Sequence, residues 1–391
     1  MTPDPAARTL GRLDAITGLR WWAAFAVFLF HINNLVPLPL PIAEIAKFGY
    51  LGVAFFFVLS GFVLTWSWRP EVDKRTFYWR RFSRVYPLHV VTLLLAIPVF
   101  YSFAPDPEQT WVKPFDIALL VLCLFLLQGW SRDPVILFAG NPASWTLTAE
   151  AFFYALHPFI TLVVRRLTLV GALAAAGGVV AFAFATRGWI ALDPGGMVGA
   201  LPWPVLRLNE FVLGMCLAWA FRKGWLPRIP LIVPVALIGA WLVTLAILPD
   251  RPETLAAYGA VAPYTNEIAT ALCALLIVSV ASLDMRGRSR IMSSRPLVAL
   301  GEWSFAFYLI HATFIYVARD LFGRQPGGWT GLLWVAGMLA LSIVAAWALH
   351  VLVEAPVERR LRRWQNRRRD ERTVAAAADE RRQDDVSPAG F

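Results

Sequence analysis

The stretch LDAITGLRWWAAFAVFLFH, residues Leu13–His31, decides the fold class and carries the first candidate site. It is an apolar run with a cation, Arg20, near its start and an imidazole, His31, at its end. Residues eleven positions apart on an α-helix are separated by roughly three turns and about 16 Å along the axis. We therefore expect Arg20 and His31 on one face of one membrane helix. Ionisable side chains inside a span are functional candidates, although an anchoring arginine and a hydrogen-bonded core histidine would give the same pattern.

The composition predicts an all-α, polytopic membrane protein. Of the 391 residues, 58% are hydrophobic and 16% are charged, whereas a soluble domain carries about 25% charged residues. The apolar segments are 16–36, 48–68, 85–103, 116–129, 145–164, 169–186, 205–221, 231–248, 266–282, 300–318 and 330–353. A span needs about 17 to 25 apolar residues, so the short fourth segment fits a re-entrant or interfacial piece better. We expect a bundle of about ten transmembrane helices plus that one short segment.

The charge distribution predicts how the chain is oriented. With ten crossings and a cytoplasmic N-terminus, most of the 36 Lys and Arg residues fall on the cytoplasmic side, as the positive-inside rule requires. The net charge of +10 is then a topology signal and does not indicate nucleic-acid binding. We expect a multi-pass protein of the inner (plasma) membrane with both termini in the cytoplasm. Residues 1–356 would form the membrane domain, and residues 357–391 a basic tail that frays from a short helix into disorder.

Three groups of charged residues outside the first segment are candidates for chemistry or for structure. Arg81 and Arg84 are spaced i, i+3, and a guanidinium pair suits phosphate, although positive-inside decoration would also place arginines there. Glu150 lies a few residues into an apolar run, where a carboxylate must be protonated, paired or in contact with water. Arg207 and Glu210 are also spaced i, i+3, and here we expect a structural ion pair.

Several other residues have a structural interpretation. Gly61 and Gly214 lie within apolar segments and predict notches where another helix approaches closely. His311 lies among aromatic residues, which is more typical of a hydrogen-bonded core histidine than of a catalyst. The three cysteines have no CxxC spacing and no histidine neighbours, so we expect no metal site and no disulfide framework.

Taken in order, these motifs resemble the membrane-bound acyltransferase-3 family, integral O-acyltransferases that modify sugars and sugar-bearing metabolites. The matching blocks are Arg20 with His31, FFxLSGF at Phe56–Phe62, RxxR followed by Tyr-Pro at Arg81–Pro87, WxLxxExxFY at Trp145–Tyr154, and LGxxSFxxYLxH at Leu300–His311. They extend over almost the whole membrane part. The first helix departs from the commonest pattern, because it reads LDAITGLR where LDGLR is usual, and this leaves the acceptor open.

The resemblance implies an enzyme that moves an acyl group from acyl-CoA, with acetyl-CoA as the expected co-substrate and no metal. The acceptor would be a hydroxyl of a carbohydrate or glycosylated metabolite, with membrane lipid as the surrounding partner. Arg81 and Arg84 would bind the donor phosphates, and Arg20 would lie at the same entrance. His31 would act as general base or carry the acyl group transiently. Glu150 would fix the tautomer of His31, directly or through one water.

A different functional class remains open at this point. A transporter or flippase of a lipid-linked or small polar substrate would also place His, Glu and Arg inside a helical bundle. It would not need acyl-CoA binding, nor a cytoplasmic arginine pair aligned with an arginine–histidine helix.

Overall fold

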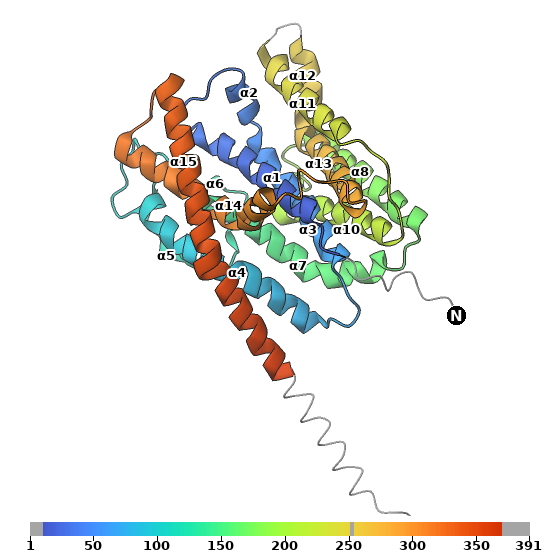
Figure 1. Ribbon diagram of the computed structural model, residues 1–391. Helices are drawn as coiled ribbons and strands as arrows, with labels where there is room; N and C mark the ends of the chain where they lie inside the picture. Colours follow the sequence, from blue (N-terminus) through green and yellow to red (C-terminus); the bar gives the residue numbers. More distant parts are fainter. Residues whose placement is uncertain (1–10, 251–253, 370–391) are drawn as a thin grey trace, which may run out of the picture.

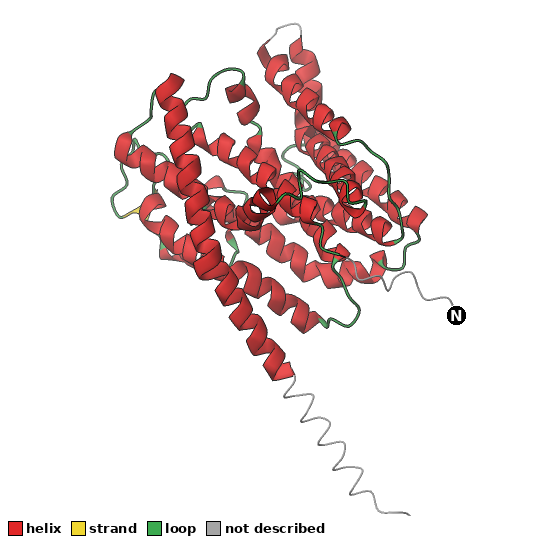
Figure 2. Cartoon of the chain, in the orientation of Figure 1, coloured by secondary structure: helices red, strands yellow, loops and turns green. Residues whose placement is uncertain are grey.

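The computed structural model describes residues 11–250 and 254–369. This part of the chain is almost entirely helical, and its two short strands, β1 (Tyr101–Ser102) and β2 (Lys113–Pro114), pair in parallel (Figure 2). The longer helices are α1 (Asp14–Ile32), α3 (Gly52–Trp66), α4 (Lys74–Phe100), α7 (Trp145–Val164), α8 (Leu169–Leu192), α10 (Leu208–Arg222), α11 (Ile232–Ile247), α13 (Thr265–Met285), α14 (Arg295–Phe322) and α15 (Gly328–Leu349). The shorter helices are α2 (Ile42–Ala46), α5 (Ile117–Leu124), α6 (Pro134–Leu137), α9 (Trp203–Leu206) and α12 (Leu255–Val261).

The number of possible spans confirms the predicted fold class. Nine helical stretches of the described chain are long and apolar enough to cross a membrane, and α11 adds a shorter apolar helix of 16 residues. Helix α5 has only 8 residues. At 1.5 Å per residue it is about 12 Å long, which cannot cross a hydrocarbon core of about 30 Å. The short fourth apolar segment is therefore not a span in this fold.

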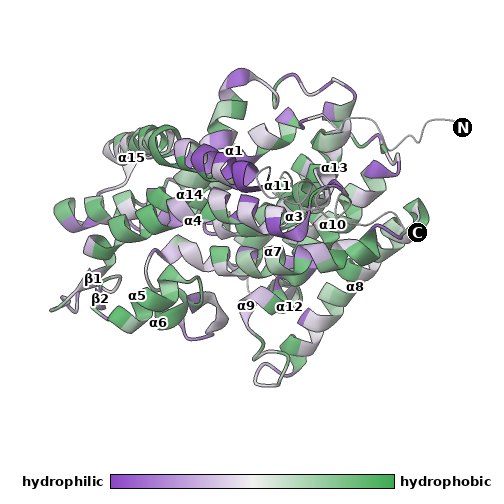
Figure 3. Ribbon diagram, turned by 90° about the horizontal axis from the view of Figure 1, so that it is seen from below, coloured by the Kyte–Doolittle hydropathy of each residue, from purple (hydrophilic) through white to green (hydrophobic). Residues whose placement is uncertain are grey.

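The outer helices expose apolar surface, as a membrane protein requires. Of the 18 residues in each helix that are best suited to span a membrane, only 17% in α8 and 11% in the stretch that contains α15 are buried inside the protein. Figure 3 shows hydrophobic residues along both helices. Helix α15 runs along one side of the bundle and continues, through a π-helical turn at His350–Glu354, as a straight extension to Arg369 (Figure 1). The rest of the predicted tail lies outside the described residues.

Glycines set the closest helix contact in the centre. A Cβ atom added to Gly61 on α3 would clash with the carbonyl oxygen of Phe211 on α10. One added to Gly214 on α10 would clash in turn with the carbonyl oxygen of Val58 on α3. The two backbones therefore touch, which confirms that both glycines are packing notches.

Helices α1 and α14 form a second close pair, and this pair positions the site. A Cβ atom on Gly301 of α14 would clash with the carbonyl oxygen of Thr17 on α1. Further along the same two helices, His31 meets His311. Because these two contacts follow each other in the same order along α1 and along α14, the two helices run parallel. Since α15 returns from α14, the end of α15 lies at the same end of the bundle as the start of α1.

Helix α4 begins earlier than hydropathy predicts. Asp73 is its N-cap, and its carboxylate accepts a hydrogen bond of 2.9 Å from the backbone N–H of Thr76. The helix therefore starts at Lys74, inside a stretch too polar to register as part of a membrane segment. Arg81 and Arg84 consequently lie about two to three turns inside α4 rather than at its start.

Candidate active site

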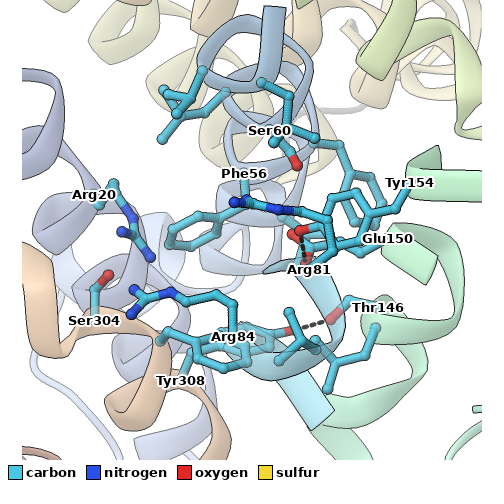
Figure 4. Close-up of a pocket in the computed structure, with 18 residues that line it drawn as sticks. Arg20, Phe56, Ser60, Arg81, Arg84, Thr146, Glu150, Tyr154, Ser304 and Tyr308 are labelled. Carbon is cyan, nitrogen blue, oxygen red and sulfur yellow. Dashed lines mark hydrogen bonds between the residues drawn. The ribbon is translucent and has the colours of Figure 1, made fainter. Parts of the chain in front are cut away.

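A cavity of about 160 Å³ lies between α1, α3, α4, α7 and α14, and we call it the inner cavity (Figure 4). Its walls are mostly apolar, and each of the five helices contributes at least one polar or charged side chain. Its lining includes Arg20, Phe56, Ser60, Leu64, Arg81, Arg84, Thr146, Glu150, Tyr154, Ser304 and Tyr308. Four of the five predicted site residues are thus brought to one place: Arg20, Arg81, Arg84 and Glu150.

Two of the three arginines have no internal partner. Among the described residues, Arg20 and Arg81 make no salt bridge and no side-chain hydrogen bond, and the Nε of Arg81 is buried. Both guanidinium groups point into the inner cavity from opposite walls (Figure 4). A buried guanidinium normally pairs with carboxylate or phosphate oxygens, so these two groups keep unused hydrogen-bond donors that face the cavity.

Arg84 differs from them because carboxylates of the α15 extension hold it. Its Nη1 atom pairs with Glu354 and also with Glu358 at 3.2 Å. The same extension packs on the start of α4, where the indole N–H of Trp79 donates to the carbonyl oxygen of Leu361 at 2.9 Å. The prediction treated Arg84 as equivalent to Arg81 and did not foresee these partners. The carboxylates are more than 260 residues away in sequence, and spacing carries no signal for such a contact.

Glu150 lies with the arginines and not with His31. Its Oε2 atom accepts a hydrogen bond of 2.7 Å from the hydroxyl of Tyr154, one turn further along α7. No hydrogen bond joins Glu150 to His31 in the described structure, so the direct form of the predicted contact is wrong. The nearby cations with which Glu150 interacts electrostatically are Arg20, Arg81 and Arg84.

His31 is paired with a second histidine. Its Nδ1 atom lies 3.0 Å from Nε2 of His311 and 3.1 Å from the carbonyl oxygen of Val27. His311 is fully buried, and its Nδ1 lies 2.9 Å from the carbonyl oxygen of Phe307. The sequence interpretation of His311 as a hydrogen-bonded core group is accurate, but it missed that the bonded partner is His31.

The two carbonyl oxygens fix the tautomers of this neutral pair. A carbonyl oxygen only accepts, so Nδ1 of His311 carries its proton and Nε2 of His311 has the lone pair. Nδ1 of His31 is then the donor, shared between Val27 and His311. The remaining ring nitrogen of His31, Nε2, therefore carries a lone pair and is the basic atom of the pair.

Tyr308 connects the inner cavity with the histidine pair. It lines the cavity, and its ring centre is 6.2 Å from that of His311. Its hydroxyl lies 3.2 Å from that of Thr146 across the cavity wall (Figure 4). One layer of side chains thus separates the arginines from the imidazoles. No group of three or more His, Cys, Asp or Glu side chains in the described chain is placed to hold a metal ion.

Comparison with known proteins decides the family. Residues 13–351 match the family described as an acyltransferase domain, which is most of the chain and includes every residue of the inner cavity. The chain belongs to the acyltransferase-3 family. It is an integral membrane O-acyltransferase.

Individual relatives agree with this assignment. The chain is 36% identical over 398 residues to acyltransferase MdmB of Streptomyces mycarofaciens, covering 94% of this chain and 95% of that protein. It is 25% identical to O-acetyltransferase OatA of Staphylococcus aureus and 24% identical to peptidoglycan O-acetyltransferase OatA of Listeria monocytogenes. These matches cover 80% and 89% of this chain but only 53% and 56% of the relatives, so the chain spans about half of their length. No solved structure matches the chain.

Proposed function

We propose that this acyltransferase-3 protein moves an acyl group, acetyl in the simplest case, from acyl-CoA to a hydroxyl of a carbohydrate or glycosylated metabolite. The observation that carries the proposal is the inner cavity. It presents the unpartnered guanidinium groups of Arg20 and Arg81 one side-chain layer away from a histidine pair with a defined basic nitrogen. A phosphorylated thioester donor supplies the missing anion and the acyl group together.

The choice of acceptor is supported by the named relatives. The Listeria relative is a peptidoglycan O-acetyltransferase, so its acceptor is a glycan. The Streptomyces relative matches this chain over 95% of its own length, which favours an acceptor that a membrane domain of this size can handle alone. A glycosylated metabolite or a membrane-associated glycan meets that requirement.

In the proposed reaction, His31 acts as a general base. Its Nε2 atom takes the proton of the acceptor hydroxyl while the hydroxyl oxygen attacks the thioester carbonyl. A new C–O bond forms, the C–S bond breaks, and the imidazolium returns the proton to the departing CoA thiolate. The hydrogen bond from Nδ1 of His31 to His311 holds the ring in the required tautomer. A two-step route through an acyl-imidazole would use the same nitrogen.

The inner cavity would hold the donor. We assign Arg20 and Arg81 to donor contacts, and Arg84 to the same wall, where Glu354 and Glu358 set its position. Glu150 is the carboxylate that balances this cluster when the donor is absent, and Tyr154 orients it. Since the cavity lies toward the end of the bundle where α1 starts and α15 ends, cytoplasmic termini would let the donor enter from the cytoplasm.

The test is transfer by the purified protein in detergent or lipid nanodiscs. Protein incubated with radiolabelled acetyl-CoA and a panel of glycosides should yield acceptor-bound label that mild alkali releases, as expected for an ester. Absence of ester label from every glycoside, with uptake of a glycoside into proteoliposomes instead, would favour the transporter class over this proposal.

A further inference from the structure

A second cavity, of about 270 Å³, adjoins the inner cavity, and we call it the outer cavity. It lies where α3 ends, α4 begins and α7 ends, which are three helix termini at one end of the bundle (Figure 1). Its lining comes from residues 64–81 and from residues 157–165. These residues come from two stretches of chain that are about 75 residues apart, so sequence spacing carries no signal for grouping them.

The outer cavity is strongly cationic. Its five cations are Arg69, Lys74, Arg80, Arg81 and Arg165, and in the described chain none of them forms a salt bridge. The carboxylate that shares this lining is Asp73, and it is already engaged as the N-cap of α4. One carboxylate thus shares the wall with five cations, so the wall keeps a net positive charge that favours an anionic occupant.

Aromatic and apolar faces lie beside the cations. The rings of His157 and Phe77 stack at 4.9 Å with an interplanar angle of 12°. Trp68 lines the same space. Cations together with planar apolar faces match an occupant that carries phosphates and a flat heterocycle, which is the chemistry of a nucleotide.

The two cavities meet at Arg81. Arg81 and Leu64 line both of them, and the Nε of Arg81 is buried with no hydrogen-bond partner among residues 11–250 and 254–369. In Figure 4, the guanidinium of Arg81 reaches into the inner cavity beside Tyr154 and Glu150. A single elongated ligand would therefore place one end among the outer cations, pass Arg81, and end near Tyr308.

We propose that the outer cavity binds the phosphorylated nucleotide end of the donor while the acyl-bearing arm passes Arg81 into the inner cavity. This inference rests on the proposed function and adds a second donor subsite to it. Arg165 and its neighbour Arg166 provide a matched pair for a test. Both are exposed at the end of α7, but only Arg165 lines the outer cavity.

The experiment compares donors that lack successive parts of the nucleotide. KM is measured for acetyl-CoA, acetyl-dephospho-CoA and acetyl-pantetheine with wild type, Arg165→Gln and Arg166→Gln. We expect Arg165→Gln to raise KM for acetyl-CoA by about tenfold, the lower end for a charge-assisted hydrogen bond. The same variant should leave KM for acetyl-pantetheine unchanged, and Arg166→Gln should match wild type with every donor.

A binding measurement makes the result independent of turnover. Adenosine 3′,5′-bisphosphate should displace labelled CoA from wild type and from Arg166→Gln, and about tenfold more of it should be needed with Arg165→Gln. Equal KM changes for all three donors, or equal effects in both variants, would overturn the inference. So would an Arg165→Gln effect that disappears in nanodiscs without anionic lipid, because the occupant would then be a lipid headgroup. Absence of transfer from every donor would instead reject the proposed function.

Discussion

Two sites within the helical bundle hold buried arginines, and the arginines differ in whether they have ion-pair partners. Arg207, the residue before α10, forms a 2.7 Å ion pair with Glu210 on α10 and a 2.6 Å hydrogen bond to Asn266 on α13. Asn266 donates in turn to Glu210 at 2.9 Å, which closes a triangle that we call the α10–α13 cluster. In the inner cavity, by contrast, Arg20 and Arg81 have no such partners in the described chain.

The difference separates structural charge from functional charge. Removing one partner from a closed buried network leaves an uncompensated charge, so such a network is a stability element. In the inner cavity, Arg20 and Arg81 lie near Glu150 without forming an ion pair in the described chain, so we expect them to contribute more to anion binding than to stability. Residue type does not distinguish the two sites, because each places arginine near a glutamate, Glu210 in one and Glu150 in the other. Their partners do.

The largest expected effect lies at the histidine pair beside the open cavity. His31→Ala removes the basic nitrogen, and general-base catalysis contributes typically about 10²- to 10⁴-fold, so turnover should fall by that amount. Thermal unfolding and CoA binding should stay close to wild type, because the arginines remain. Full activity at wild-type expression would remove His31 from the mechanism.

The next effect is on stability and concerns the α10–α13 cluster. Arg207→Ala strands the fully buried Glu210, and breaking a buried pair in this way costs about 3–5 kcal/mol. The free energy of unfolding, measured by titration with denaturing detergent, should fall accordingly. Replacing Arg207 and Glu210 together with apolar residues should cost less than the single change. If Arg207→Ala is as stable as wild type, the α10–α13 cluster is not a stability element and does not differ from the inner cavity in this way.

Sequence reasoning predicted those features that depend on local spacing. The helix carrying Arg20 and His31 and the Arg207–Glu210 pair follow from spacings of eleven and three residues, and the glycine notches follow from small residues within apolar segments. It also predicted that Arg20 would share a site with Arg81 and Arg84, through the family resemblance rather than through spacing.

What it could not predict are contacts between distant helices. The pairing of His31 with His311 joins residues 280 positions apart, and the clamp on Arg84 comes from residues after α15. The expected Glu150–His31 contact relied on estimated depths in the membrane, and depth alone does not fix which face of a helix a side chain occupies. The early start of α4 depends on a capping carboxylate at Asp73 that hydropathy does not register.

Arg81→Ala is the counterpart of Arg207→Ala in the open cavity. Loss of a charge-assisted phosphate contact should cost roughly 1.5–3 kcal/mol, which is about ten- to a hundredfold in donor affinity. Stability should be nearly unchanged, because Arg81 forms no salt bridge within the described residues that the substitution could remove. Equilibrium binding of labelled CoA measures the expected loss of donor affinity, and the detergent titration measures whether stability is unchanged. If Arg81→Ala unfolds as easily as Arg207→Ala but still binds CoA normally, Arg81 is a structural residue and not a donor-binding one.

The smallest expected effect is at Asp73, where a role as the cap of α4 can be separated from a role in the outer cavity. Asp73 lines the outer cavity among its cations, yet its carboxylate caps α4. Asp73→Ala should lower the stability by about 1 kcal/mol through loss of the cap, whereas Asp73→Asn keeps a capping oxygen and should cost little. Both variants remove a negative charge from the cationic wall, so neither should weaken CoA binding. Weaker binding in Asp73→Asn would show that the carboxylate contributes to the donor site.

The cap also predicts how this stability depends on pH. The hydrogen bonds from Thr76 hold the pKa of Asp73 below its ordinary value, so the folded state favours the ionised carboxylate. A carboxylate with a lowered pKa contributes stability that is fully present above its unfolded pKa, about 4, and is lost as pH falls through its folded pKa. The gap in unfolding temperature between wild type and Asp73→Ala should therefore be full at pH 7 and shrink below about pH 4. Asp73→Asn has no such charge to lose, so its gap from Asp73→Ala should not depend on pH in this range. A gap that shrinks equally in both comparisons would mean that other carboxylates, and not the cap of α4, cause the change.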